Sequence, residues 1–138
     1  MRFMIIVKAT RESEQGVMPG EALIAAMAEY HEQLAKAGVL LDASGLQPST
    51  KGWRVRHAGA QRRVIDGPFA ETKELVAGYT IIQTRNRQEA LEWTRRFPNP
   101  SLDGGAAEIE VRQMFELEDF EPGAATEKFR ELGAGGTR

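Results

Sequence analysis

The stretch Arg2-Phe3-Met4-Ile5-Ile6-Val7-Lys8-Ala9 decides the fold, because its apolar side chains alternate onto both sides of an extended backbone. Phe3, Ile5 and Val7 would share one side, and Met4 and Ile6 the other. A strand that is apolar on both sides is usually central in its sheet. We therefore expect residues 2–9 in the middle of a sheet, with neither face wholly exposed to water.

A helix is expected next, after a polar loop over residues 10–15. From Glu21 to Ala37, apolar residues recur at steps of three and four, which is the period of an amphipathic helix. His31 lies on the flank of this apolar stripe. Gly38 follows the last periodic residue and is expected to end the helix.

The rest of the chain divides by the same signals. The expected elements are strands over residues 39–43, 75–84 and 108–115, a hairpin with arms over 53–57 and 61–65, and a helix that stops before Pro98. Asn86 is expected to cap that helix, with Glu89 as its capping-box partner. Gly78, inside the strand over 75–84, predicts a bulge or a close approach of two backbones.

The C-terminal part differs in composition, because it is acidic and rich in glycine after Phe115. We interpret residues 1–117 as one domain and residues 118–138 as a tail. At most a short helix is expected in that tail, over residues 127–132, with a frayed end.

Without the hairpin, the order of elements is β-α-β-β-α-β, which is the ferredoxin-like arrangement in the α+β class. Two helices can cover only one face of a four-stranded antiparallel sheet. A second copy of the chain, packed sheet against sheet, is the simplest cover for the other face. We therefore expect a homodimer.

Composition excludes several classes of protein. The chain has 138 residues, no cysteine, two histidines and a formal net charge of −2. No cysteine excludes disulfides, thiolate metal sites and a cysteine nucleophile. The near-neutral balance argues against direct nucleic-acid binding, and no apolar run is long enough for a membrane span. We expect a cytoplasmic protein with no cofactor and no bound metal.

One segment is more specific than the general pattern. Asp66-Gly67-Pro68-Phe69-Ala70-Glu71-Thr72-Lys73-Glu74 resembles, without a substitution, the signature of the DGPFAETKE family, a branch of the YCII-related proteins. Residues 3–7, 37–40, 45–48, 89–93 and 110–112 resemble further parts of the same family. The resemblance covers roughly residues 2–115 and leaves the tail outside.

This resemblance implies a ferredoxin-like chain that forms a dimeric α+β barrel. Wider relatives of the family act on small, often aromatic molecules, and some members occur beside or fused to extracytoplasmic-function sigma factors. The resemblance also implies a His–Asp pair as active-site groups. His31 matches the expected histidine, and either Asp42 or Asp66 could be its partner.

The catalytic candidates are therefore His31 and Asp66, with Asp42 as the alternative carboxylate. A neutral imidazole held by a carboxylate can act as a general base. The candidates for substrate binding are Arg54, Phe69, Glu71, Lys73, Tyr79 and Arg112. Each has a structural alternative, because solvated charges on loops and strand edges and aromatic side chains in a core are common.

Three functions follow from these patterns. The first is a small-molecule enzyme or binding protein in which His31 moves a proton. The second is a non-enzymatic accessory or regulatory module associated with sigma factors. The third, ranked last, is a metal-assisted dioxygenase or isomerase, for which the chain offers too few ligands at fixed spacing.

Overall fold

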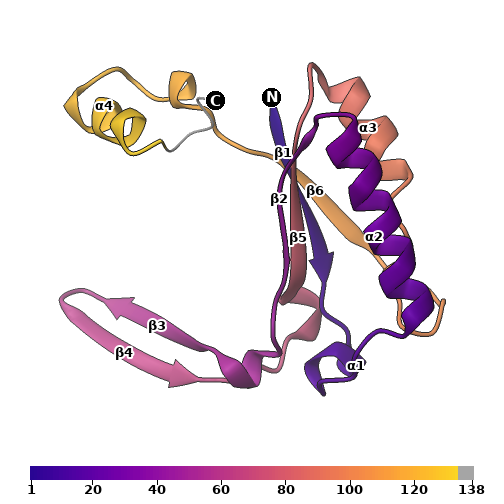
Figure 1. Cartoon of the computed structure of the whole chain (residues 1–138). Helices are drawn as coiled ribbons and strands as arrows, with labels where there is room; N and C mark the ends of the chain where they lie inside the picture. The colour runs from indigo at the N-terminus through magenta and orange to yellow at the C-terminus, as the bar shows by residue number, and fades with distance from the viewer. Residues whose placement is uncertain (134–138) are drawn as a thin grey trace.

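A computed structural model describes residues 1–133 of the chain (Figure 1). It is a mixed α+β structure with two antiparallel sheets. The strands are β1 (Arg2–Lys8), β2 (Leu40–Gly45), β3 (Trp53–Ala58), β4 (Gln61–Asp66), β5 (Val76–Gln83) and β6 (Ile109–Gln113). The helices are α1 (Arg11–Glu14), α2 (Glu21–Lys36), α3 (Arg87–Arg95) and α4 (Ala124–Glu131). Short 3-10 turns lie at Ser49–Lys51, Thr72–Glu74 and Leu117–Asp119.

The four-stranded sheet has the order β2-β5-β1-β6, with every neighbouring pair antiparallel. The expectation that the first strand is central is confirmed, since β1 pairs with β5 on one side and β6 on the other. Ile5 lies opposite both Thr80 and Val111. The second sheet is the expected hairpin, β3 paired with β4.

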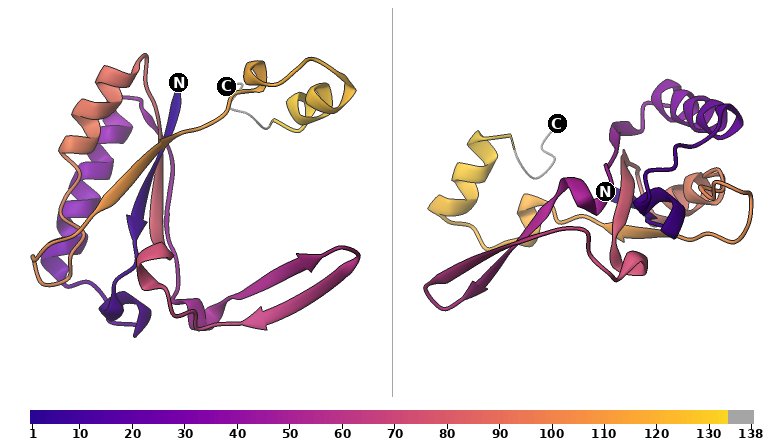
Figure 2. Two further views of the ribbon diagram at one scale, coloured as in Figure 1. Left: turned by 180° about the vertical axis from the view of Figure 1, so that it is seen from behind. Right: turned by 90° about the horizontal axis from the view of Figure 1, so that it is seen from below.

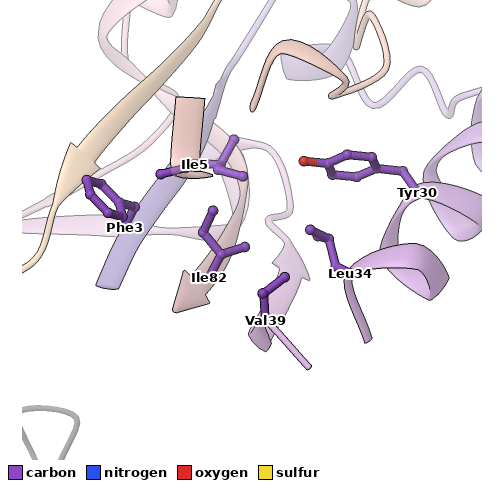
Figure 3. Close-up of a cluster of buried hydrophobic side chains, with 7 residues drawn as sticks. Phe3, Ile5, Tyr30, Leu34, Val39 and Ile82 are labelled. Atoms are coloured by element: carbon purple, nitrogen blue, oxygen red, sulfur yellow. The ribbon is translucent and has the colours of Figure 1, made fainter. Parts of the chain in front are cut away.

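Helices α2 and α3 cover one face of the four-stranded sheet, as the two views in Figure 2 show. Tyr30 and Leu34 of α2 point toward Ile5 and Ile82 of the sheet (Figure 3). Leu34, Ile5 and Ile82 are fully buried. The hydrophobic core therefore lies between α2 and the centre of the sheet.

The end of α2 follows the sequence signal closely. Gly38 has φ +76°, a backbone conformation that favours glycine. The Val39 N–H donates to the Leu34 carbonyl, and the Gly38 N–H donates to the Ala35 carbonyl. These two hydrogen bonds form a Schellman motif, which satisfies carbonyls that the helix leaves unpaired.

Two local expectations were wrong. Residues 11–14 are the short helix α1 and not a loop, because Thr10 and Ser13 form a reciprocal capping box. Glu89 does not complete the capping box of α3. The Asn86 side chain caps the helix by accepting from the Glu89 N–H at 2.8 Å, but the Glu89 carboxylate accepts from Arg85.

The close approach predicted at Gly78 is confirmed. A Cβ atom on Gly78 would lie 3.1 Å from the Ser44 carbonyl oxygen of β2. The pairing of β1 with β5 also becomes irregular here, between Val7 and Lys8. Glycine thus lets the edge strand β2 pack tightly at the end of the sheet that borders α1.

The second face of the four-stranded sheet is left uncovered by residues 1–133 (Figure 2). Its middle carries the half-buried side chains of Met4, Ile6 and Ile81, since their neighbours Phe3, Ile5 and Ile82 face α2. Glu110 and Arg112 lie on this uncovered face and pair at 3.2 Å. Glu110 also pairs with Lys8 at 3.1 Å.

Two segments extend from the same side as this uncovered face (Figure 1). The hairpin β3–β4 leaves one end of the sheet, and the segment after β6 leaves the other. The helix in that segment, α4, begins three residues before the expected start at residue 127. The proposed division at residue 117 stays a prediction, and residues 134–138 of the tail lie outside the described residues.

Within the described residues, no helix has both the length and the apolar character needed to cross a membrane.

Candidate functional site

A cavity of about 1170 Å³ lies between the N-terminal half of α2 and the sheet. Its walls come from α1, α2, the adjoining ends of β2 and β5, and the loops after β2 and α3. Apolar side chains form most of this wall, and they include Leu23, Met27, Leu46, Phe97 and Leu102. The polar groups that border it include His31, Thr80, Ser13 and Glu14.

His31 is half-buried in the wall of this cavity, on the side of α2 that faces the sheet. Its neighbour Tyr30 packs into the core, so the imidazole lies where the core opens into the cavity. The ring makes an edge contact with Phe97, with centroids 6.3 Å apart. The helical register that buries Tyr30 and Leu34 therefore also aims His31 at the sheet.

Both ring nitrogens of His31 have a partner. Nδ1 lies 2.7 Å from the Met27 carbonyl oxygen, one helical turn earlier. Nε2 lies 2.8 Å from the Thr80 hydroxyl on β5. A carbonyl oxygen can only accept, so this hydrogen-bond network assigns the proton of the neutral ring to Nδ1. Nε2 then accepts from the Thr80 hydroxyl with its single lone pair, at the border of the cavity.

Thr80 was not among the residues singled out from the sequence. It is 2% exposed and lies on the core face of β5, two residues before the buried Ile82. A polar residue at a core position of a strand needs a hydrogen-bond partner, and this is a signal that the sequence contained. The Met27 carbonyl could not be found in that way, because every residue has one.

Neither candidate aspartate contacts His31. Asp42 follows an irregularity in β2 and faces the uncovered side of the sheet, where Tyr79 donates to its carboxylate at 3.0 Å. This hydrogen bond to a carboxylate raises the pKa of Tyr79. Thr80, the next residue of β5, points to the opposite side and carries the contact with His31. The sheet therefore separates Asp42 from His31.

Asp66 lies at the end of β4, opposite Trp53 at the base of the hairpin, and is exposed. It is not among the residues that border the cavity. A carboxylate was expected at one of the ring nitrogens of His31, and the Met27 carbonyl takes that place at Nδ1. A backbone carbonyl can fix the tautomer and orientation of a histidine in the same way.

The other candidates for substrate binding lie apart from His31. The Arg54 guanidinium stacks on the Phe69 ring, 3.8 Å from its centroid. Glu71 and Lys73 are exposed at the turn before β5. Tyr79 borders the cavity, although its hydroxyl is directed at Asp42. The remaining candidate, Arg112, pairs with Glu110 on the uncovered face.

The nine-residue segment 66–74 is connected to the cavity through Ser49. The Ser49 N–H and hydroxyl both donate to the Glu14 carboxylate, and the Ser49 oxygen accepts from the Phe69 N–H at 3.0 Å. A Cβ atom on Gly67 would overlap the Ser49 carbonyl oxygen. We call these four residues, Glu14, Ser49, Gly67 and Phe69, the Ser49 clasp.

The Ser49 clasp determines where one wall of the cavity lies. The cavity is bordered by Leu46, Gln47, Pro48, Thr50 and Lys51, and Ser49, which lies between Pro48 and Thr50, ties this loop to α1 and to segment 66–74. The Gly67 N–H also donates to the Gly52 carbonyl at 3.0 Å. The segment therefore supports the cavity wall from behind, without bordering the cavity itself.

Among residues 1–133, no group of three or more histidine and acidic side chains is placed to hold a metal ion.

Comparison with known proteins shows what this chain is similar to. A family model described as the YCII-related domain matches residues 1–115. An uncharacterised protein of Rhizobium meliloti (strain 1021) is 30% identical over 95 residues, which cover 69% of this chain and 77% of that protein. A 5-chloro-2-hydroxyhydroquinone dehydrochlorinase from Burkholderia phenoliruptrix AC1100, solved in complex with 2,5-dihydroxybenzoquinone, is 15% identical. That match covers 88% of this chain and 100% of the other at a TM-score of 0.45.

Proposed function

This chain belongs to the family of YCII-related domains, and from that premise we propose that it binds a small molecule in the cavity under α2. The observation that carries the proposal is the position of His31, whose Nε2 lone pair lies at the border of a largely apolar cavity of about 1170 Å³. Cavities of this kind, apolar with a few convergent polar groups, are typical ligand sites.

The chemistry of the wall suggests the class of ligand. Met27, Leu23 and Phe97 favour an apolar or aromatic body. His31 and Thr80 offer an acceptor and a hydroxyl beside it. A small aromatic molecule with a hydroxyl or carboxyl group would satisfy both parts of the wall.

The hydrogen bonds of His31 support proton transfer as the reaction at this site. Nδ1 donates its proton in a hydrogen bond to the Met27 carbonyl, so Nε2 can take a proton from an acidic hydroxyl of a ligand that displaces the Thr80 hydroxyl. The resulting imidazolium would donate from both nitrogens, to the Met27 carbonyl and to the ligand or Thr80. In this proposal the Met27 carbonyl replaces an aspartate as the orienting group.

We also propose that two chains pair through the uncovered sheet face as a dimeric α+β barrel. The order β2-β5-β1-β6, with α2 and α3 as connections on one face, is compatible with a ferredoxin-like chain. Half-buried Met4, Ile6 and Ile81 give that face an apolar centre. The residues of segment 66–74 support placing the chain in the DGPFAETKE branch of the family. A role beside sigma factors has no support among the matches, and the cytoplasmic location stays a prediction.

The binding test uses a panel of small phenols and aromatic carboxylates, with thermal stability and the NMR signal of the Met27 methyl group as readouts. A ligand present at 100 times its Kd stabilises the folded state by about 2.7 kcal/mol. We expect His31→Leu to weaken binding by about tenfold, the equivalent of one lost hydrogen bond of about 1.4 kcal/mol. In His31→Gln, the glutamine amide can still accept a hydrogen bond but cannot act as a general base. This variant should therefore bind the ligand and fail to take a proton from it.

The second histidine of the chain supplies the matched control, because His57 lies on the hairpin and does not border the cavity. His57→Leu should leave both binding and conversion unchanged. Equal ligand affinity of His31→Leu and the unmodified protein would refute the proposed site. Ligand-induced NMR shifts that are confined to the hairpin and segment 66–74 would refute it as well.

A further inference from the structure

The two segments that extend past the uncovered sheet face both carry exposed apolar side chains. We call Trp53–Asp66 the hairpin arm and residues 115–132 the tail arm. Trp53 and Val64 are 62% and 63% exposed, and Phe115 and Leu132 are 69% and 72% exposed. Apolar side chains gathered on protruding segments usually mark a contact surface.

The strand register sorts the hairpin arm into two faces. Val55 lies opposite Val64, so these two share a face with Trp53. Arg56 lies opposite Arg63 on the other face. Like charges in this position destabilise an isolated hairpin. The arm holds four arginines and a single acidic residue, Asp66, and is therefore strongly cationic.

The tail arm has the opposite charge. Residues 115–121 contain four acidic side chains and no basic one. Glu116 pairs with Arg2 at 3.1 Å, and the exposed Glu118 pairs with Arg130 of the same arm at 3.9 Å, whereas Asp119 and Glu121 are exposed and form no ion pair among the described residues. The rings of Phe115 and Phe120 pack together with centroids 5.1 Å apart and stay largely exposed. Each arm thus combines apolar side chains with a net charge, which is positive on the hairpin arm and negative on the tail arm, where Lys128 and Arg130 offset two of the six acidic residues.

Because of where the two arms lie, their charges can decide which direction the two-fold axis of a dimer takes. They leave opposite ends of the strands and extend to the same side (Figures 1 and 2). A two-fold axis along the strands would bring hairpin arm to hairpin arm and tail arm to tail arm. A two-fold axis across the strands and parallel to the sheet would bring each hairpin arm to the partner's tail arm.

We propose that the dimer uses the second axis, which runs across the strands and parallel to the sheet. The hairpin arm of each chain then packs on the tail arm of its partner. The first axis would set arginines against arginines and carboxylates against carboxylates, and such like-charge contacts across an interface are costly. The second sets the cationic hairpin arm against the acidic tail arm, and lets the face with Trp53, Val55 and Val64, which also carries Arg62, cover the exposed apolar side chains of the tail arm. This inference rests on the dimer proposed above, and it adds the partner surface and the direction of the axis.

The test uses cysteine cross-linking, for which the chain is suited because it has no cysteine of its own. Val64→Cys on the hairpin arm and Phe120→Cys on the tail arm are made in chains of different mass. The two variants are mixed, allowed to exchange subunits and treated with a short bismaleimide. We expect the product that joins the two variants to exceed either self-linked product by at least tenfold.

Ala25→Cys, on the exposed surface of α2, is the control and should not link to Val64→Cys. Self-linking of Val64→Cys at the same yield as the mixture would overturn the proposal in favour of the first axis. A dimer by sedimentation in which the arms do not link would overturn it as well. A monomer would refute both the dimer and the arm exchange, whereas the ligand titration of His31 variants tests the cavity separately.

Discussion

The imidazole of His31 has a fixed hydrogen-bond pattern, and this pattern determines what the residue can do. Nδ1–H donates to the Met27 carbonyl oxygen, which lies 2.7 Å from Nδ1, and the Thr80 hydroxyl oxygen lies 2.8 Å from Nε2. A ligand hydroxyl that enters the cavity would compete with Thr80 for the same lone pair. The tautomer and the orientation of His31 are therefore fixed by two neutral groups of its own chain, and not by a carboxylate.

The neighbouring residue, Tyr30, has a structural role in the core and not a role at the cavity. Its ring is 4% exposed and its hydroxyl donates to the Trp93 carbonyl at 2.7 Å, which ties α2 to α3. Burial raises the pKa of Tyr30 to about 12, and the nearby Arg96 lowers it by a smaller amount. A neutral phenol is thus part of the folded core.

The pH dependence of Tyr30 follows from this shift. A phenol in the unfolded chain ionises near pH 10, so the stability that comes from burying neutral Tyr30 is complete below about pH 10 and is lost as the pH rises to about 12. In Tyr79→Phe, which leaves Tyr30 as the single tyrosine, the tyrosinate absorbance of the folded protein should have its midpoint near 12.

The same variant unfolded in urea is the control for that titration, and its absorbance should have a midpoint near 10. A midpoint near 10 in the folded variant would contradict the burial of Tyr30.

At the scale of elements, the segment from Asp66 to Glu74 connects the hairpin, α1 and the loop after β2. Its glycine, Gly67, packs against the Ser49 carbonyl, where a larger residue has no room. Ser49 in turn binds Glu14 of α1. Parts of the chain that are distant in the sequence are joined at this point, and of these α1 and the loop after β2 border the cavity, whereas the hairpin and the segment itself do not.

We expect Gly67→Ala to lower the free energy of unfolding by about 1–3 kcal/mol or more, because its Cβ would overlap the Ser49 carbonyl oxygen and lie 2.7 Å from its carbon. Gly52→Ala is the matched control, since its Cβ would meet that oxygen at an ordinary 3.8 Å. Urea denaturation measures both. Equal stability of the two variants would show that the Ser49 clasp does not hold the loop tightly.

At the scale of the whole molecule, the sheet is covered on one face by α2 and α3 and left open on the other (Figure 2). A single layer of helices leaves half of the apolar pattern of β1 without a partner among residues 1–133. The side chains of Met4, Ile6 and Ile81 on that face are half-buried by their neighbours alone. A second chain on this face would complete their burial.

Ile81→Lys should therefore weaken the proposed dimer by on the order of a hundredfold or more, since an unpaired charge buried in an interface costs several kcal/mol. Sedimentation velocity over a range of protein concentrations measures this change. Ala25→Lys, on the exposed side of α2, should leave the association unchanged. A dimer that is equally stable in both variants would show that the chains associate through another surface.

The candidate site could be predicted from the sequence only in part. His31 was found because one histidine on the edge of an apolar helical stripe is unusual, and it does border the cavity. Its partners could not be found by looking for carboxylates, because they are a hydroxyl on β5 and a backbone carbonyl. The charged residues of segment 66–74 attracted attention by composition, yet Glu71 and Lys73 lie exposed at a turn.

The sequence by itself determined the elements and their faces, because periods of two and of three to four and the signals at Gly38 and Asn86 depend on neighbours along the chain. Only the tertiary structure decided which candidates meet. Thr80 and His31 are 49 residues apart, and Ser49 and Glu14 are 35 apart. Such contacts depend on strand pairing and on the face of the sheet that a side chain occupies. One step along β5 therefore separates Tyr79, which binds Asp42, from Thr80, which binds His31.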